Sequence, residues 1–265
     1  MPLTLCFDPI VAPEAPEATN DGNKDVSNAV KIETGIVHGS CGSAMLNHNG
    51  VTIICSVNGP KSGILGKNDM DIACFDCEIK YAPFVDQPGY PQGMQSFGAT
   101  ESSKSILESS YSQSKNLSTT SVEFTESILQ TFSKEALIGS VRLQSYPKMS
   151  ITLHFTVLQS SGNIGVDLSA IISCGSVALM DSSIEIYDVI TASTVGINAK
   201  KELVMEIEQF DKSITSYVTV ATRANSAELA QLWSEGRVEG DNLFPMIELA
   251  CKKNAQLASK IESEC

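Results

Sequence analysis

Cations are scarce in this sequence. Its 265 residues include 18 lysines and arginines against 31 aspartates and glutamates, a formal net charge of −13, and the arginines are Arg142, Arg223 and Arg237. Proteins that grip nucleic acid across their whole surface need clustered cations to neutralise phosphates. Arginine is also the preferred residue for binding a phosphate group, because its guanidinium group can donate two parallel hydrogen bonds. The composition therefore argues against a general nucleic-acid-binding surface and leaves few candidates for a phosphate-handling site.

Long apolar runs are absent as well. No unbroken stretch of about 18 apolar residues is present, so we expect no membrane span. The N-terminus lacks a basic start followed by an apolar stretch, which predicts that it is not a secretory signal. The eight cysteines are then expected to be reduced thiols of a cytosolic or nuclear protein. Apolar residues still make up 42% of the chain, enough for a real core.

Composition divides the chain into a tail and one domain. Residues 1–28 are rich in proline and acidic residues and are expected to form a flexible N-terminal tail. Residues 29–262 are expected to form a single domain. Between about 96 and 121, ten of 26 residues are serine. This predicts a long surface loop, either a tolerated insertion or a docking or phosphorylation segment.

Hydrophobic periodicity predicts strands and helices in two rounds. Apolar alternation predicts strands at 31–46 (imperfectly), 51–57, 73–81, 151–159, 184–192, 202–208 and 216–221, and helical spacing predicts helices at 122–137, 168–180, 227–234 and 243–261. Asn49-Gly50 predicts a tight hairpin turn, and Asn58-Gly59-Pro60 is expected to end the strand that follows. The first three strands are expected to pair antiparallel. Strands and then a helix, twice over, predict an α+β fold of two sheet-and-helix layers.

Cysteine and glycine motifs have structural explanations. Cys74 and Cys77 form a lone CxxC on a predicted strand, where an offset of three puts the thiols on opposite faces, so we interpret them as structural. Gly39 and Gly42 have the spacing of an RNA-clamping GxxG loop. That loop joins two helices, however, and a strand bend fits this context better. Neither a P-loop nor a dinucleotide-binding motif is present.

Histidine also gives no sign of a reactive or metal site. His38, His48 and His154 lie near no pattern typical of a nucleophile or a metal-ligand set. His48 falls in the predicted turn, and His154 falls on the face opposite the apolar side of its strand. We therefore interpret all three as surface or edge residues and predict no metal site.

Four segments in order resemble the RNase PH family. Gly42–Gly63 resembles its N-terminal hairpin, and Tyr81–Phe84 resembles the strand that follows. Ser145–Asn163 is similar to the strand ending in L-Q-A-D-G-G, and Ser176–Ser193 is similar to the A-L-x-D-A-G-I-P segment. The resemblance covers about residues 30–250. It implies an RNase PH-like fold, also described as ribosomal protein S5 domain 2-like.

The sequence departs from that family where active members bind phosphate and catalyse. Active members hold phosphate with a Ser/Thr-Arg pair after D-G-G, where this chain has Ile164-Gly165. They also place two aspartates six apart on a later strand. The matching positions here are Glu206 and Lys212 or, with the alignment shifted by one, Met205 and Asp211. At most one carboxylate of the pair survives, which compromises acid assistance or metal binding by the pair.

Two further positions bear on the same resemblance. The basic stretch that guides RNA in the family is replaced by VDQPGYPQGMQSF, which has no cation. Asp181 does match the aspartate of the family's L-x-D-A-G-I segment, and we interpret it as a capping or structural residue.

Copies of this fold without phosphorolytic activity are ring subunits of the eukaryotic RNA exosome. The resemblance therefore implies a non-catalytic structural subunit that supports 3′-to-5′ RNA processing and degradation, with no catalytic, phosphate-binding or metal residues and no cofactor. The implied partners are other RNase PH-like exosome subunits in a six-membered ring, an S1/KH-type cap subunit, and RNA only through the assembled channel. The implied location is the nucleus and nucleolus, and also the cytoplasm.

Two alternatives remain open at this level. The chain could be an active phosphate-dependent 3′-to-5′ exoribonuclease that uses Glu206 and Asp211, with Lys148 in place of the missing arginine. It could instead be an independent, weak RNA-binding module, although the charge of −13 disfavours intrinsic affinity.

Overall fold

The structure is a computed structural model, and it describes residues 30–62, 72–85, 117–198, 203–205, 207, 214–226, 228–238 and 240–264. In the first long helix, side chains are described from Thr125 onward. The predicted tail at 1–28 and most of the predicted serine-rich loop lie outside the described residues.

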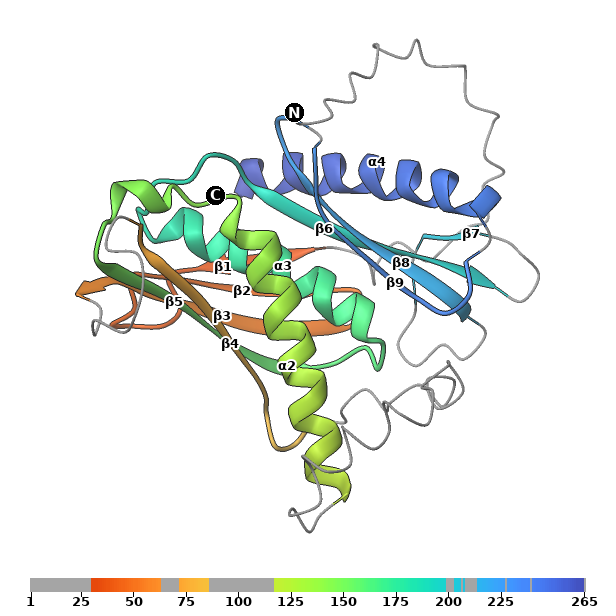
Figure 1. Cartoon of the computed structure of the whole chain (residues 1–265), viewed down its shortest axis with the longest axis horizontal. Helices are drawn as coiled ribbons and strands as arrows, with labels where there is room; N and C mark the ends of the chain where they lie inside the picture. The colour runs from red at the N-terminus through yellow and green to blue at the C-terminus, as the bar shows by residue number, and fades with distance from the viewer. Residues whose placement is uncertain are drawn as a thin grey trace, which may run out of the picture.

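Two sheets form the framework of the domain (Figure 1). The first contains β1 (Lys31–Thr34), β2 (Gly42–His48), β3 (Val51–Ser62), β4 (Cys74–Tyr81) and β5 (Met149–Gln159), in the order β1-β2-β3-β5-β4. The second contains β6 (Ile190–Asn198), β7 (Leu203–Val204), β8 (Ile214–Arg223) and β9 (Leu229–Glu235), in the order β7-β6-β8-β9. The helices are α2 (Leu117–Ile138), α3 (Ile164–Asp181) and α4 (Gly240–Glu264), with a short 3₁₀ turn at Leu143–Ser145.

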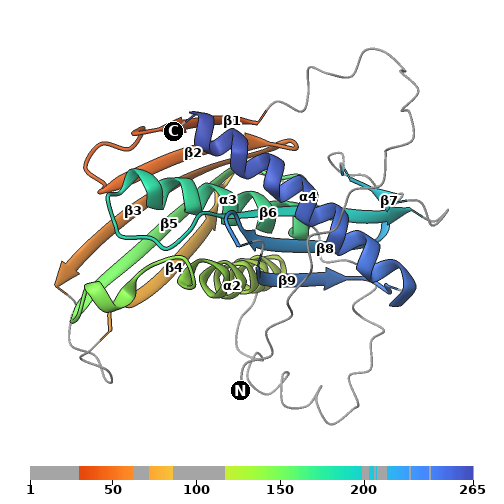
Figure 2. The same cartoon turned by 90° about the horizontal axis from the view of Figure 1, so that it is seen from above.

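The helices separate and cover the sheets. Helix α3 packs against β2 and β3 on one side and against β6 and β8 on the other, so it lies between the two sheets. Helix α2 runs beside α3 and packs on β4, while α4 covers the outer face of β6 and β8 (Figures 1 and 2). This arrangement confirms the predicted α+β fold with its sheet-and-helix layers.

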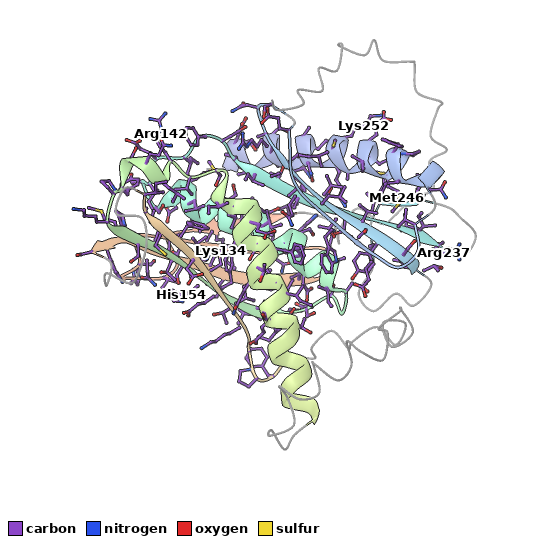
Figure 3. The ribbon with its side chains drawn as sticks, in the orientation of Figure 1. Lys134, Arg142, His154, Arg237, Met246 and Lys252 are labelled. Carbon is purple, nitrogen blue, oxygen red and sulfur yellow. The ribbon has the colours of Figure 1, made fainter. Side chains whose placement is uncertain are left out.

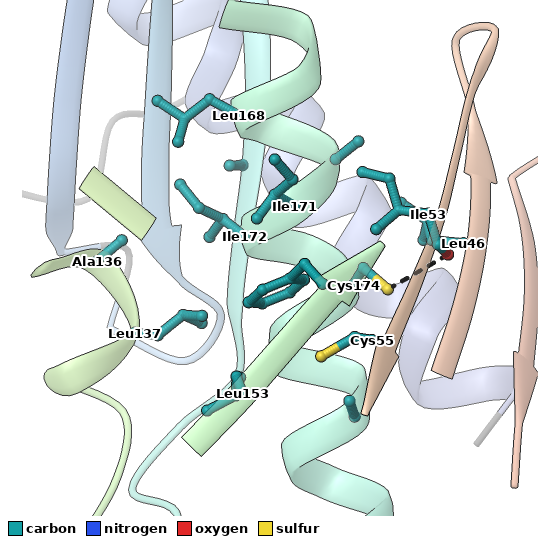
Figure 4. Packing of buried hydrophobic residues seen from close by; sticks show 14 of the residues in the cluster. Leu46, Ile53, Cys55, Ala136, Leu137, Leu153, Leu168, Ile171, Ile172 and Cys174 are labelled. Carbon is teal, nitrogen blue, oxygen red and sulfur yellow. Dashed lines mark hydrogen bonds between the residues drawn. The ribbon is translucent and has the colours of Figure 1, made fainter. Parts of the chain in front are cut away.

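Helix α3 lies at the centre of the hydrophobic core. Every residue from Ile164 to Leu179 is buried, and Ile171 and Ile172 lie near side chains of α2 and of the first sheet (Figure 4). A Cβ on Gly175 would lie 2.8 Å from both Leu137 and Phe155, so glycine lets α2 and β5 approach α3 closely. Each fully buried large aliphatic side chain contributes roughly 1.5–3 kcal/mol.

The composition of α3 bears on the expectation that the chain has no membrane span. Residues Ile164–Asp181 are long and apolar enough to cross a membrane, with a mean hydropathy of 1.5. However, 89% of this window is buried inside the domain. The helix is apolar all round because sheets cover it on both sides, as expected for a core helix.

Helix α2 closes the outer edge of β4 with three polar side chains spaced four residues apart. Glu126 accepts the backbone N–H of Tyr81 at 3.1 Å, and the Gln130 side chain donates to the carbonyl of Ile79 at 3.3 Å. Lys134 contacts the Asp76 carboxylate at 3.2 Å. The first two contacts occupy backbone groups that β5, on the other side of β4, does not use, and the third pairs two side chains. We call these three α2 residues the edge clamp.

Several local predictions are confirmed. Asn49 and Gly50 have φ values of 52° and 72°, the left-handed pair expected of a tight hairpin turn between β2 and β3. The alternation predicted for 73–81 and 151–159 matches the burial of β4 and β5 residue by residue. The last predicted helix, 243–261, is α4.

The predicted end of β3 and the predicted neighbour of β4 are wrong. Strand β3 continues to Ser62 because a register irregularity between Asn58 and Lys61 accommodates Pro60, which cannot donate to the ladder. Strand β4 pairs in parallel with β5 rather than antiparallel with β3. Alternation determines which face of a strand is buried, but it does not identify the neighbouring strand.

The predicted helix at 227–234 is also wrong, because Leu229–Glu235 forms β9. Ala230 and Trp233 pack against the main core, while the backbone pairs antiparallel with β8. The apolar spacing of so short a segment fits a helix or a strand, and here pairing with the free edge of β8 makes it a strand. Other boundaries also differ: α2 begins within the predicted serine-rich loop, α3 begins four residues before 168, and β6 begins at Ile190 rather than 184.

Candidate functional site

The residues that follow β5 lead into α3 and contain the position predicted to have lost its phosphate-binding arginine. A Cβ built on Gly165 would contact the Tyr217 ring of β8, at 2.6 Å from its Cδ2, and would lie 2.6 Å from the Thr219 hydroxyl. Distances this short do not occur between real Cβ atoms and their neighbours. Unless the side chains of Tyr217 and Thr219 move, no larger side chain fits at this position, and a guanidinium group has no room.

The backbone of Gly165 is fastened to the second sheet. Its carbonyl accepts hydrogen bonds from Thr194 at 2.9 Å and from Thr219 at 3.1 Å. These two threonines are direct cross-strand partners on β6 and β8. The first turn of α3 is therefore held against the sheet on the side where the resemblance would place a ligand-binding side chain.

A tyrosine and a glutamate complete this side of the loop. The Tyr217 hydroxyl donates a hydrogen bond to Glu235, the last residue of β9. Burial and the adjacent Glu235 raise the pKa of Tyr217 far above its ordinary value, so it stays a neutral donor. Burial also raises the pKa of Glu235. The place next to Gly165 is thus occupied by an aromatic ring and a carboxylate.

A second carboxylate, Asp167, lies on the inner side of the same turn and is fully buried. It accepts hydrogen bonds from the Ser160 hydroxyl at 2.6 Å and the Tyr81 hydroxyl at 3.0 Å. It also accepts the backbone N–H and the hydroxyl of Ser161, both at 3.0 Å. Burial raises the pKa of Asp167, and the hydrogen bonds it accepts oppose that rise.

Neither carboxylate has a basic partner within the part of the chain that the structure describes. The ion pairs among the described residues include Lys134–Asp76, Arg142–Glu185, His154–Glu78, Arg223–Glu228 and Lys252–Glu248. Figure 3 shows Lys134, Arg142, Arg237 and Lys252 spread over different elements. The start of α3 therefore holds two carboxylates and, among the described residues, no cation that could attract an incoming phosphate.

Lys148, the residue considered as a replacement for the missing arginine, lies far from Gly165. Lys148 precedes β5 and Ile164 follows it, so the length of this 11-residue strand, about 35 Å, separates them. Lys148 therefore cannot take the place of an arginine at position 165. Met205 is half-exposed, and its carbonyl accepts a hydrogen bond from Lys253 at 2.9 Å.

The predicted carboxylate positions lie outside the described residues. Glu206, Asp211 and Lys212 fall in gaps of the described chain, so the prediction that at most one catalytic carboxylate survives stays a prediction.

The cysteines have the positions predicted for structural residues. Cys74 is exposed and Cys77 is buried, which confirms that their thiols face opposite sides of β4. Burial raises the pKa of Cys77 to about 12, so its thiol is a poor nucleophile at neutral pH. All six described cysteines are free.

The histidines are dispersed, and one prediction about them needs correction. His38 is exposed, and His154 forms a half-exposed pair with Glu78. His48 is more enclosed than a turn residue should be, because α4 brings Lys253 and Lys260 near it. Burial and these two lysines lower the pKa of His48 to about 4. Within the described residues, no group of three or more histidines, cysteines or carboxylates could hold a metal ion.

Asp181 and the two motif glycines have structural contacts. Asp181 accepts the backbone N–H of Ser43 at 2.9 Å and so ties the end of α3 to β2. Gly39 has a φ of 93° in the connection between β1 and β2. A Cβ on Gly42 would lie 2.5 Å from the Cα of Ser182. Gly39 therefore lies in the predicted strand bend, and Gly42 allows the backbone of β2 to approach the backbone at Ser182 closely.

Sequence reasoning found the loss at Gly165 but missed the residues that surround it. Asp167 could have been suspected, because an acid in the first turn of an otherwise apolar helix needs a partner. Tyr81, Tyr217 and Glu235 carried no such signal, since each comes from a distant strand.

Two sheets sharing one central helix, with a polar loop at its start, define an RNase PH-like α+β domain. The family model described as RNase PH, 3′ exoribonuclease family, domain 1, matches residues 28–185, more than half of the chain, and the chain belongs to this family. The predicted fold is thereby confirmed.

Named relatives extend this result over most of the chain. It is 25% identical to the fission yeast (Schizosaccharomyces pombe) exosome complex component mtr3, covering 92% of this chain and 84% of the relative. It is 24% identical to the Arabidopsis thaliana exosome complex component RRP41-like, covering 88% and 78%. Among solved structures, rice (Oryza sativa) Rrp46 has the same fold, with a TM-score of 0.65 at 15% identity over 92% of this chain and 97% of that one.

Proposed function

We propose that this chain is a structural, non-catalytic ring subunit of an RNA exosome. Relatives named as exosome components align with most of its length, which supports membership in such a complex. The contact between Gly165 and Tyr217 is the observation that supports a non-catalytic role, because it leaves no room for the arginine with which active members hold phosphate.

Electrostatics support the same role. Phosphorolysis needs inorganic phosphate beside the RNA end, and here Asp167 and Glu235 lie at the start of α3 without a basic partner among the described residues. A phosphate would find no directed donor fork there. The chain therefore contributes surfaces to an assembly, and RNA reaches it only through a channel that several subunits build.

The assembly we propose contains other RNase PH-like subunits in a six-membered ring, together with an S1/KH-type cap subunit. Within the ring we assign the chain to the type called mRNA transport regulator. Residues Ile32–Leu46, Ser145–Lys148 and Ser183–Asp188 resemble that type, as does the long C-terminal helix that carries Cys251. The alignment with fission yeast mtr3 supports this assignment. The proposed location is the nucleus and nucleolus, and also the cytoplasm.

Co-expression and a phosphorolysis assay test the proposal. The chain is expressed alone and with the RNase PH-like subunits of its own organism, and co-purifying chains are identified by mass after a pull-down at moderate salt. We expect aggregation or self-association alone and recovery as a defined hetero-oligomer with a partner. A stable, well-behaved monomer that ignores these subunits would contradict the structural role.

The catalytic part is tested with labelled RNA and inorganic phosphate. We expect the chain alone to release no nucleoside diphosphate, and we expect a Glu206→Gln variant to leave the activity of the assembled complex unchanged. Phosphate-dependent release that disappears in the Glu206→Gln variant would show that this chain is an exoribonuclease.

A further inference from the structure

Four hydrogen bonds converge on one buried side chain where β5 turns into α3. Oδ2 of Asp167 accepts from Ser160 and from Tyr81, and Oδ1 accepts from the N–H and the hydroxyl of Ser161. An ionised carboxylate has about four lone-pair positions for such bonds. The contacts of Asp167 therefore match its full capacity as an acceptor, and every neighbour is a donor.

The loop at 160–163 is folded around this carboxylate. The Ser160 hydroxyl also accepts the N–H of Gly162 at 3.1 Å, and the Ser161 hydroxyl accepts the N–H of Asn163 at 3.2 Å. Asp167 is thus the final acceptor of a short chain of hydrogen bonds that includes most of the loop. Without that acceptor, several buried donors would lose their partner at once.

The negative charge at this position is balanced by dipoles. Asp167 is in the first turn of α3, where the helix dipole favours negative charge. Among the described residues it has no ion pair, and the groups around it are hydroxyls and a peptide N–H. Converging neutral donors at the start of a helix are what proteins use to hold small oxyanions.

We propose that Asp167 is an internal anion, a carboxylate supplied by the chain that occupies the place of a bound oxyanion and holds the 160–163 loop without any ligand. Asp167 is therefore a positioning residue. Truncating it should leave a small, donor-lined cavity that accepts a free carboxylate.

The test is chemical rescue of an Asp167→Gly variant, measured on the hetero-oligomer obtained by co-expression, because the chain alone is expected to self-associate. Its melting temperature should fall by about 5–10 °C, since several buried donors lose their acceptor. Sodium formate on the order of 10–100 mM should restore at least half of that loss, a range that fits the weak affinity of a three-atom ligand. Sodium chloride at the same ionic strength should not. The wild-type melting temperature should respond equally to the two salts.

Asp181→Gly is the matched control. Asp181 lies on the same helix and also accepts a backbone N–H, but it is exposed and has one such bond. Formate should not rescue this variant. Rescue of both variants to the same extent would reveal a general salt effect and overturn the proposal.

An Asp167→Asn variant keeps the inference testable if the glycine variant does not fold. The amide has one acceptor oxygen, so at least one donor pair must face an NH₂ group, and the melting temperature should fall by about 5 °C or more. The internal-anion role is overturned if formate neither stabilises nor refolds Asp167→Gly. It is equally overturned if Asp167→Asn melts within 1 °C of the wild type.

Discussion

Replacing Gly165 by alanine tests whether β8 closes the start of α3. The added methyl group would lie 2.6 Å from both Tyr217 Cδ2 and the Thr219 hydroxyl. Thr219 is held by its bond to the Gly165 carbonyl, and Tyr217 is held by Glu235, so neither can turn away without losing a hydrogen bond. Overpacking of this kind typically costs about 1–3 kcal/mol. In a chain of this size that is a fall in melting temperature of about 2–12 °C.

Thermal and urea unfolding of the co-expressed hetero-oligomer measure this effect, and two variants control it. Gly240→Ala adds a methyl group where nothing lies within 4 Å, so its stability should stay within about 0.5 kcal/mol of the wild type. In a Tyr217→Ala background the ring is gone, and the Gly165→Ala change should cost less. The double-mutant cycle should give a coupling of about 1 kcal/mol or more.

One result would refute this explanation of the closed loop. If Gly165→Ala is as stable as the wild type, the Tyr217 ring moves aside freely, and sterics do not exclude a longer side chain. The decisive form of the experiment is Gly165→Arg. We expect a destabilised protein that gains no phosphate binding, whereas a stable protein that binds phosphate would show that the site lacks only its arginine.

Three further predictions concern other buried polar groups. Tyr81→Phe removes a hydrogen-bond donor to the buried Asp167 carboxylate and should lower the free energy of unfolding, measured by urea titration, by about 1–3 kcal/mol. The control Tyr187→Phe changes a residue that is 55% exposed and should alter this free energy little. Asn254→Ala removes bonds of 2.9 and 3.0 Å from α4 to β8 and should cost on the order of 2–3 kcal/mol, more than the exposed Asn225→Ala in differential scanning calorimetry. The pKa of His48 is lowered from 6.5 to about 4 in the folded chain. Between these two pH values the unfolded chain therefore binds more protons than the folded chain. The free energy of unfolding should fall as the pH drops through this window, by at most about 3 kcal/mol and by less where water screens the ring. Urea midpoints at pH 7 and pH 4.5 should therefore converge in a His48→Gln variant; an unchanged pH dependence would show that another group is responsible.

Local pattern predicted the faces of the strands well and their neighbours poorly. In β4 and β5 every second residue is buried, because a pleated strand between a helix layer and solvent requires it. The parallel pairing of these two strands depends on the crossover through α2, which no local period encodes. The segment at 229–235 contains residues that favour helices, and only the unpaired edge of β8 makes it a strand.

The candidate site shows the same division. The absence of an arginine at Gly165 is visible in the sequence, since it needs only the order of neighbouring motifs. The ring that fills the space beside Gly165 belongs to Tyr217, 52 positions after it. One of the hydroxyls that donate to Asp167 belongs to Tyr81, 86 positions before Asp167. Contacts across such separations are made by the packing of two sheets, so they could not be predicted from local spacing.

The edge clamp on α2 has a consequence for how copies of this fold can meet. A sheet grows by presenting free N–H and C=O groups to an incoming strand. Along β4, Glu126 and Gln130 already hold two of those groups, and Lys134 stands over a third residue. A strand from a neighbouring molecule could pair with the free edge of β4 only after displacing the 22-residue helix α2. Subunits that join here must do so side chain to side chain, across the surface of α2, and not by sharing a continuous sheet.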